Sequence, residues 1–144
     1  MTLLSTVLTA WLAAAPSERA AIVVQAPDSP VRIDRASVLQ GADGPPVILY
    51  SATNPTDTPI DEFTVMAFVF DANGALKARH TAPGRRTLDA RGTKFSTMVL
   101  DGSPIEATYQ IVIGVNQAQR VGSETWWHAD LQPAAEAAVP LKKH

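Results

Sequence analysis

Apolar and polar residues alternate along several short segments of the chain, and this period of two is typical of a strand with one buried face. The clearest alternation runs over residues 31–39, and a more hydrophobic segment follows at 47–53. Clusters of Gly, Pro, Asn and Asp at 41–46 and 54–59 separate these segments from their neighbours. Because those residues favour turns, the pattern predicts short strands joined by turns.

The segment EFTVMAFVFDANGALKARH, at residues 62–80, carries the strongest local signal. In an extended chain its two faces hold Phe63, Val65, Ala67 and Val69 on one side and Thr64, Met66, Phe68 and Phe70 on the other. Both faces are largely apolar, which predicts a central strand, and the β-branched and aromatic content favours a strand over a helix. Asn73 and Gly74 tolerate the positive φ angles of a type I′ turn, so we expect a hairpin whose return strand covers 75–81.

Further alternating segments follow at 94–100, 107–115 and 120–127, with a short one at 86–88 and no long helix between them. Together with the hairpin they make about seven strands, which predicts an all-β fold, an Ig-like antiparallel β-sandwich over residues 31–128.

The 107–115 segment supplies part of the predicted core. Tyr109, Ile111 and Ile113 share one face of it, and we expect them to be buried on the strand opposite Phe68 or its neighbours. The Ala-rich residues 130–139 are expected to form a helical turn or two within a C-terminal tail, residues 129–144.

The first 21 residues differ in composition from the rest. Residues 3–15 carry only apolar and hydroxyl side chains, and small residues follow before Glu18 and Arg19. This order is typical of a secretory signal peptide and predicts a cut before Glu18, although no Lys or Arg precedes the apolar run. The alternative is an N-terminal helix packed on the domain. The apolar run is shorter than the roughly 20 residues of a membrane-spanning helix, so we expect no transmembrane span. Residues 22–30 are predicted to be a linker.

Composition narrows the class further. The chain has 144 residues, of which 46% are hydrophobic and 18% charged, and this favours one packed domain over disorder. A formal charge of −2 gives no general attraction to nucleic acid. With no Cys, disulfides and thiolate metal sites are excluded.

Residues that often carry catalysis are scattered. The three histidines have no metal-ligand spacing, and no Gly-x-Ser-x-Gly elbow is present. Asp71 to Gly74 resembles the start of a calcium loop but lacks its later ligands, so we expect a turn in which Asp71 accepts hydrogen bonds from backbone N–H groups. The adjacent Asp61 and Glu62 point to opposite faces of a strand. The sequence therefore predicts a non-catalytic protein without metal or cofactor.

Half of the basic residues gather in one stretch of the chain. Its members are Lys77, Arg79, Arg85, Arg86, Arg91 and Lys94. If these side chains share a surface, they are candidates for binding an acidic partner. The alternative is that they protect an edge strand from pairing with other sheets.

Trp126 and Trp127 form the second candidate site. In a strand one indole faces inward and the other outward, and an exposed indole can stack on a sugar or fill a pocket on a protein partner. Alternatively, residues 129–139 fold back and cover the outward Trp.

The order of these segments resembles the bacterial extracytoplasmic Ig-like domains of the FxLYD type. The similarity rests on Tyr50–Asn54, Thr64–Asp71, Asn73 with Gly74, Leu88–Gly92, Phe95–Val99 and Tyr109–Ile113. At the motif itself the chain has Ala67-Phe-Val-Phe-Asp71. The resemblance implies a small sandwich on a secreted protein or lipoprotein, with no catalytic residues of its own.

We therefore expect a secreted or periplasmic accessory domain that binds a protein or a cell-envelope component. The alternative is a carbohydrate-binding module that uses an exposed Trp. The partner's identity and the oligomeric state are open at this stage.

Overall fold

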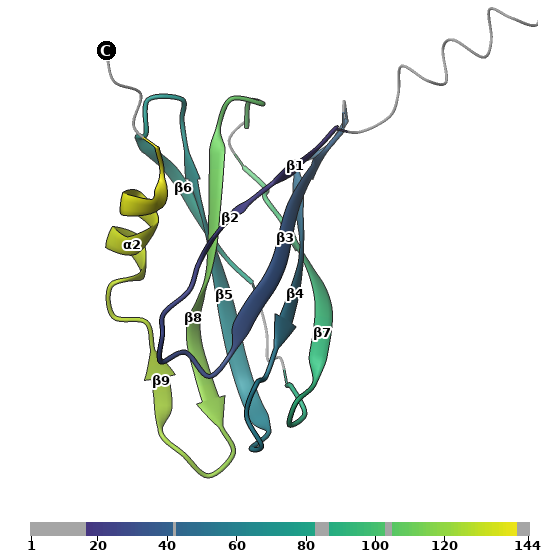
Figure 1. Cartoon of the computed structure of the whole chain (residues 1–144). Coiled ribbons are helices and arrows are strands. Elements are labelled where there is room, and N and C mark those ends of the chain that lie inside the picture. The colour runs from purple at the N-terminus through teal and green to yellow at the C-terminus, as the bar shows by residue number, and fades with distance from the viewer. Residues whose placement is uncertain (1–16, 42, 83–86, 103–104, 141–144) are drawn as a thin grey trace, which may run out of the picture.

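The computed structural model describes residues 17–41, 43–82, 87–102 and 105–140. In these residues the chain forms nine strands and one helix (Figure 1). The strands are β1 (Ser17–Ala20), β2 (Ile22–Val24), β3 (Arg32–Gln40), β4 (Val47–Thr53), β5 (Ile60–Phe70), β6 (Leu76–Thr81), β7 (Thr93–Val99), β8 (Gln110–Arg120) and β9 (Thr125–Trp127), and the helix is α2 (Leu131–Ala138).

The strands form two sheets that face each other as a sandwich, which confirms the predicted all-β fold (Figure 1). Sheet A has the order β1-β3-β4-β7. Sheet B has the order β2-β8-β5-β6, and β9 also pairs with β8. Neighbouring strands are antiparallel except for β2 and β8, which are parallel. No helix in the described ranges is long and apolar enough to cross a membrane.

Residues 17–24 contribute one strand to each sheet, where the sequence predicted the end of a leader and the start of a linker. Ser17 lies opposite Gln40 in sheet A, and Ile22 lies opposite Val112 in sheet B. The crossing is made at Ala21, whose N–H donates to the Ala36 carbonyl at 3.0 Å. These pairings join segments far apart in the sequence, so local alternation does not reveal them. The remainder of the predicted leader, residues 1–16, lies outside the described residues.

The core between the sheets contains the residues expected from alternation. Phe63 and Val65 of β5 are buried there with Ile48 of β4. Ile111 and Ile113 of β8 are buried in the same cluster, as predicted. Their partners across the sheet are Val69 and Ala67, the neighbours of Phe68. Tyr109 was also predicted to be buried on this strand, but it lies just before β8 and is only partly buried against the cluster.

Phe68 and Phe70 point to the other side of sheet B, into a second apolar cluster. The helix α2 covers them there with Leu131, Ala135 and Val139. Strand β5 is therefore central and buried on both faces, as its apolar pattern predicted. The helix itself confirms the helical turns predicted in the tail. Leu131 approaches the sheet at Gly114, where an added Cβ would lie 2.8 Å from Leu131 Cδ1.

The predicted β5–β6 hairpin is confirmed, but the expected type I′ turn is wrong. That turn needs positive φ at both central residues, and of Asn73 and Gly74 only Gly74 has it, at 85°. Instead, Gly74 N–H donates to the Asp71 carbonyl at 3.0 Å, and the register shifts between Val69 and Phe70. Asp71 Oδ1 accepts the N–H groups of Asn73 and Ala75, both at 2.9 Å, which confirms its predicted capping role.

Other boundaries differ from the pattern. At the short strand predicted for residues 86–88, Leu88 forms only an isolated bridge to Ile60. Strand β8 runs on to Arg120, and the chain turns at Gly122, where φ is 78°.

Candidate binding surfaces

The predicted basic site does not form one surface in the described residues. Arg85 and Arg86 lie outside those residues. Lys77 and Arg79 are on β6, beside the end of β5, where Arg79 is opposite Phe68. Arg91 and Lys94 lie after Leu88, which bridges to the first residue of β5. Lys77 and Arg79 therefore lie near one end of β5, and Arg91 and Lys94 lie near the other. A strand extends by about 3.3 Å per residue, so the length of β5 keeps the two pairs apart.

Each of these four basic side chains also has a partner within the domain. The contacts are Lys77 Nζ to Asp71 Oδ2 at 3.6 Å, Arg79 Nη1 to Gln132 Oε1 at 3.1 Å, Arg91 Nε to Asp57 Oδ1 at 2.9 Å, and Lys94 Nζ to Thr87 Oγ1 at 3.1 Å. Because β6 ends sheet B, Lys77 and Arg79 occupy the edge position that the alternative interpretation gave them.

The two tryptophans point in opposite directions, as predicted for a strand. Trp126 is half-buried against the core, and its Nε1 donates to Asp28 Oδ2 at 3.0 Å. The ring of His128 meets the Trp126 ring edge-on, with centroids 5.9 Å apart. Trp127 is the exposed member, at 62%. Both border a hollow of about 420 Å³ that residues 24–28 and 126–130 line with Ala134.

The helix does not cover Trp127, which corrects the expectation that the tail folds over it. Residues 131–138 do fold back, but they pack on Phe68 and Phe70 because those positions form the larger apolar surface of sheet B. The outward indole stays in solvent.

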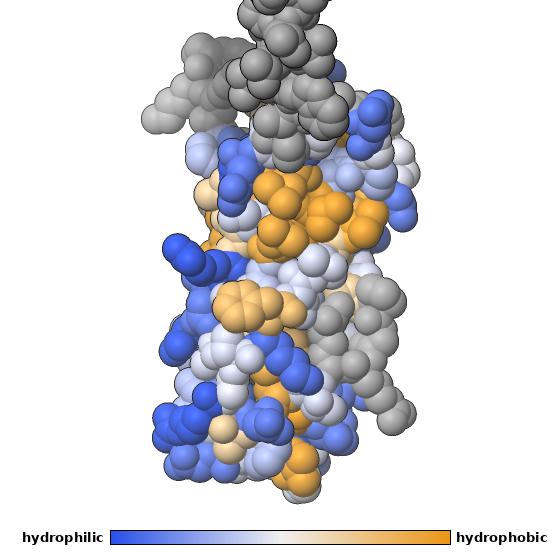
Figure 2. Space-filling model, turned by 90° about the vertical axis from the view of Figure 1, so that its right-hand side faces the viewer, coloured by the Kyte–Doolittle hydropathy of each residue, from blue (hydrophilic) through white to orange (hydrophobic). Residues whose placement is uncertain are grey.

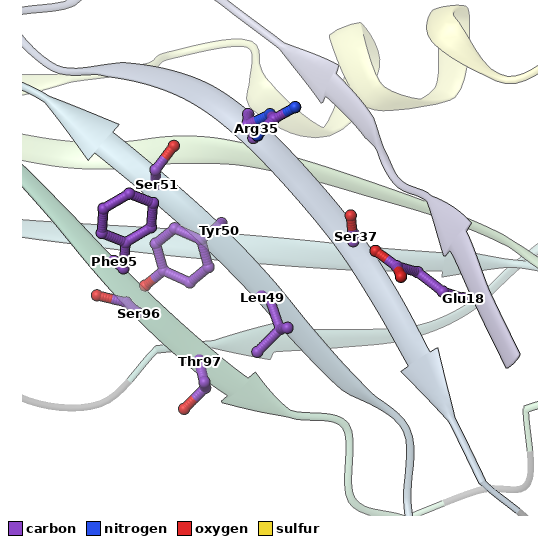
Figure 3. Close-up of a pocket in the computed structure, with 9 residues that line it drawn as sticks. All are labelled: Glu18, Arg35, Ser37, Leu49, Tyr50, Ser51, Phe95, Ser96 and Thr97. Atoms are coloured by element: carbon purple, nitrogen blue, oxygen red, sulfur yellow. The ribbon is translucent and has the colours of Figure 1, made fainter. Parts of the chain in front are cut away.

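A larger hollow, of about 460 Å³, lies on the outer face of sheet A. Figure 3 shows side chains from β1, β3, β4 and β7 around it. Two rows of paired residues cross the sheet at this place. They are Ser37–Leu49–Thr97 and Arg35–Ser51–Phe95. Phe95 is 84% exposed and is the most exposed large apolar side chain of the described residues.

The alternation of β4 explains this face. Ile48 and Ala52 point into the core, so Leu49 and Ser51 between them point outward. The neighbouring row along the sheet is Leu39–Val47–Val99, which continues the apolar surface. Leu49 is 38% exposed and Val99 is 48% exposed. Figure 2 shows the apolar patch on this side of the molecule.

The charges on this face are few. Glu18 and Arg35 border the hollow on β1 and β3. At the far end, Arg32 Nε donates to Asp34 Oδ1 at 2.6 Å, and the Thr53 hydroxyl donates to Asp34 Oδ2. Burial raises the pKa of Asp34, but the hydrogen bonds from Thr53 and Arg32 outweigh burial, so its pKa lies below the ordinary value. The face therefore offers mainly apolar side chains and hydroxyls, with Glu18 and Arg35 at the border of the hollow.

Sequence reasoning missed this hollow. The available signal was that Leu49 and Phe95 occupy outward positions of two alternating segments, 47–53 and 94–100. Single exposed apolar residues are common, and only the pairing of β4 with β7 brings these two together. Within the described ranges, no group of three or more His, Cys, Asp or Glu residues is placed to hold a metal ion.

Comparison with protein-family models, curated proteins and solved structures found no match to this chain. The resemblance to FxLYD-type domains stays a prediction.

Proposed function

We propose that this chain is a non-catalytic accessory domain that binds a protein or cell-envelope component through the outer face of sheet A, in the secreted or periplasmic compartment. The observation that carries the proposal is Phe95, 84% exposed beside a hollow of about 460 Å³. The outer face of sheet B has its own phenylalanines under α2, whereas sheet A has no covering element in the described residues.

The chemistry of the face suits an apolar, uncharged partner surface. Fully burying a Phe side chain is worth about 1.5–3 kcal/mol, so a partner that covers Phe95 gains a large part of that amount. The hydroxyls of Ser37 and Thr97 beside it can hydrogen-bond to polar groups of the partner. Few charges take part, so we expect association that depends little on salt.

The test compares two exposed apolar residues in a capture experiment. The immobilised chain is exposed to an envelope extract, and captured proteins are quantified by mass spectrometry. We expect Phe95→Ala to reduce capture of the specific partner at least about tenfold, as for an interface hot spot. Val121→Ala is the matched control, since Val121 is 54% exposed in the turn after β8. Equal capture by the two variants would contradict the proposal.

The same assay separates this face from the predicted basic site. If Arg85 and Arg86 carry the binding, changing both to Glu weakens capture, most of all at low salt. We expect that double variant to capture like wild type at both low and physiological salt.

A second candidate is glycan binding at the Trp127 hollow. The observation that favours it is the hydrogen bond from Trp126 to Asp28, which fixes one indole and leaves Trp127 exposed beside polar groups of Asp28 and His128. A sugar ring could stack on Trp127. On a glycan array we expect Trp127→Ala to lose any signal that wild type gives, while Phe95→Ala keeps it. A blank wild-type array would reject this candidate.

A further inference from the structure

We propose that strand β7 pairs antiparallel with β7 of a second copy of this chain, so that two copies of sheet A form one continuous sheet. Strand β7 ends the order of sheet A and pairs with β4 on one side. Among the described residues no strand pairs with its other side. The proposal does not depend on which partner the outer face binds.

The hydrogen-bonding groups on the open side of β7 follow from two bonds at its ends. Leu100 N–H donates to the Pro46 carbonyl at 2.9 Å, and Asn54 N–H donates to the Gly92 carbonyl at 2.9 Å. Backbone groups of successive strand residues point to alternate sides, so the even-numbered residues of β7 face β4. Residues 93, 95, 97 and 99 therefore direct their N–H and C=O groups to the open edge.

The edge strands β1 and β6 carry features that discourage pairing, and β7 has fewer of them. Edge strand β6 carries Lys77 and Arg79, and its pairing contains a bulge. Strand β1 has four residues, two of them charged. Strand β7 has seven residues in unbroken register with β4, one charge at Lys94, and the exposed Phe95 and Val99. A seven-residue edge with unbroken register, a single charge and two exposed apolar side chains can pair with another strand.

A second copy fits this edge by symmetry. Full overlap of the two strands centres on Ser96, which puts Phe95 opposite Thr97 of the second copy. The diagonal neighbours of Phe95 are then Phe95 and Val99 of the second copy, at the roughly 7–8 Å that aromatic side chains reach. The two Lys94 residues lie about 13 Å apart along the strands, farther than the screening length of about 8 Å, so their repulsion is weak.

The first test removes one edge-facing donor without touching the bonds to β4. Thr97→Pro deletes an N–H that points to the open edge, where proline is compatible with a strand. Thr97→Val is the matched control, because it keeps the N–H and the β-branched shape. By sedimentation equilibrium we expect a wild-type dimer, a dissociation constant at least about tenfold higher for Thr97→Pro, and little change for Thr97→Val. A monomer at all concentrations, or a dimer that Thr97→Pro does not weaken while circular dichroism shows it folded, would overturn the proposal.

The second test needs no disruptive change and reads the register. The chain has no Cys, so Ser96→Cys introduces a single thiol. In the proposed pairing the two residues 96 are directly opposite in a non-hydrogen-bonded pair, about 4.5 Å apart at Cα, within disulfide range. Mild oxidation should cross-link Ser96→Cys, whereas Thr81→Cys on the edge strand β6 should stay monomeric on a non-reducing gel. Equal cross-linking of the two variants would show random collision and refute the specific pairing.

Discussion

The two outer faces of this sandwich carry phenylalanines in opposite circumstances. On sheet B, Phe68 and Phe70 are buried beneath α2, with Phe68 1% exposed. On sheet A, Phe95 is 84% exposed. In both strands successive side chains point to opposite faces, but this geometry alone does not say which outward aromatic stays in water. The difference lies in what the rest of the chain brings to each face.

The neighbours of these residues explain why one face is covered and the other is not. Around Phe68, the outward positions of sheet B are apolar, and Gly114 lets Leu131 approach the sheet closely. Around Phe95, the outward positions include the exposed polar residues Thr97 and Arg35 as well as the apolar Leu49. The polar residues keep this face compatible with exposure to water. Burial of its apolar side chains by a partner would still contribute favourable free energy of binding.

The largest expected effect comes from emptying the covered face. Phe68→Ala should reduce the free energy of unfolding by about 3–5 kcal/mol, because a cavity remains beneath the helix. Phe95→Ala should change it by less than about 0.5 kcal/mol, since an exposed side chain contributes little to folding. Urea titrations of both variants measure the contrast. Similar losses in the two would abolish the distinction between the faces.

The close approach of the helix gives the next effect. Gly114→Ala should cost about 1–3 kcal/mol, because the new methyl group meets Leu131 Cδ1 at 2.8 Å and the Val24 carbonyl at 3.1 Å. In a Leu131→Ala background the cost should shrink, since one of the two obstacles is gone. A double-mutant cycle by thermal or urea unfolding measures this coupling. Additive losses would mean that the helix does not press on Gly114.

A smaller effect is expected at the exposed ion pairs. Arg91→Ala removes the contact with Asp57, in which both side chains are largely in solvent. We expect only a small loss of stability, which decreases further as salt is raised. Urea titrations at low and high salt give the value. A larger loss that does not respond to salt would assign the Arg91 side chain a packing role.

The smallest effect is expected when the pH is lowered. It concerns Asp71, in the turn after the strand that carries Phe68 and Phe70. The pKa of Asp71 is lowered, first by the hydrogen bond from Ala75 N–H, then by Asn73 N–H and by Lys77. Because the pKa of Asp71 is lower in the folded state, the ionised carboxylate stabilises the fold. This stabilisation is fully present above the pKa of the unfolded chain, about 4, and is lost as the pH falls through the folded pKa. Wild type should therefore lose stability more steeply than Asp71→Asn below about pH 4. Parallel pH profiles for the two would exclude this contribution.

The comparison of the faces also shows where local pattern stops being informative. The residue pattern predicted that Val65 and Phe68 lie on opposite faces of β5 and that β5 is central, because these properties depend on each residue's own neighbours along the strand. It did not indicate which face meets sheet A and which lies under the helix. The Asn73–Gly74 signal located the hairpin but not its turn type, since the register shift beside Phe70 depends on how β5 pairs with β6.

The sequence by itself determined most of the strands between residues 31 and 127, the opposite faces of Val65 and Phe68 on β5, the two opposed tryptophans and the helical tail. Tertiary structure alone decided that the tail covers Phe68 rather than Trp127, that residues 17–24 join both sheets, and that Lys77 and Arg79 lie apart from Arg91 and Lys94. It also brought Leu49 and Phe95 side by side on the open face. These outcomes depend on contacts between segments that are far apart in the chain. The energies of such contacts cannot be predicted from any short stretch of the sequence.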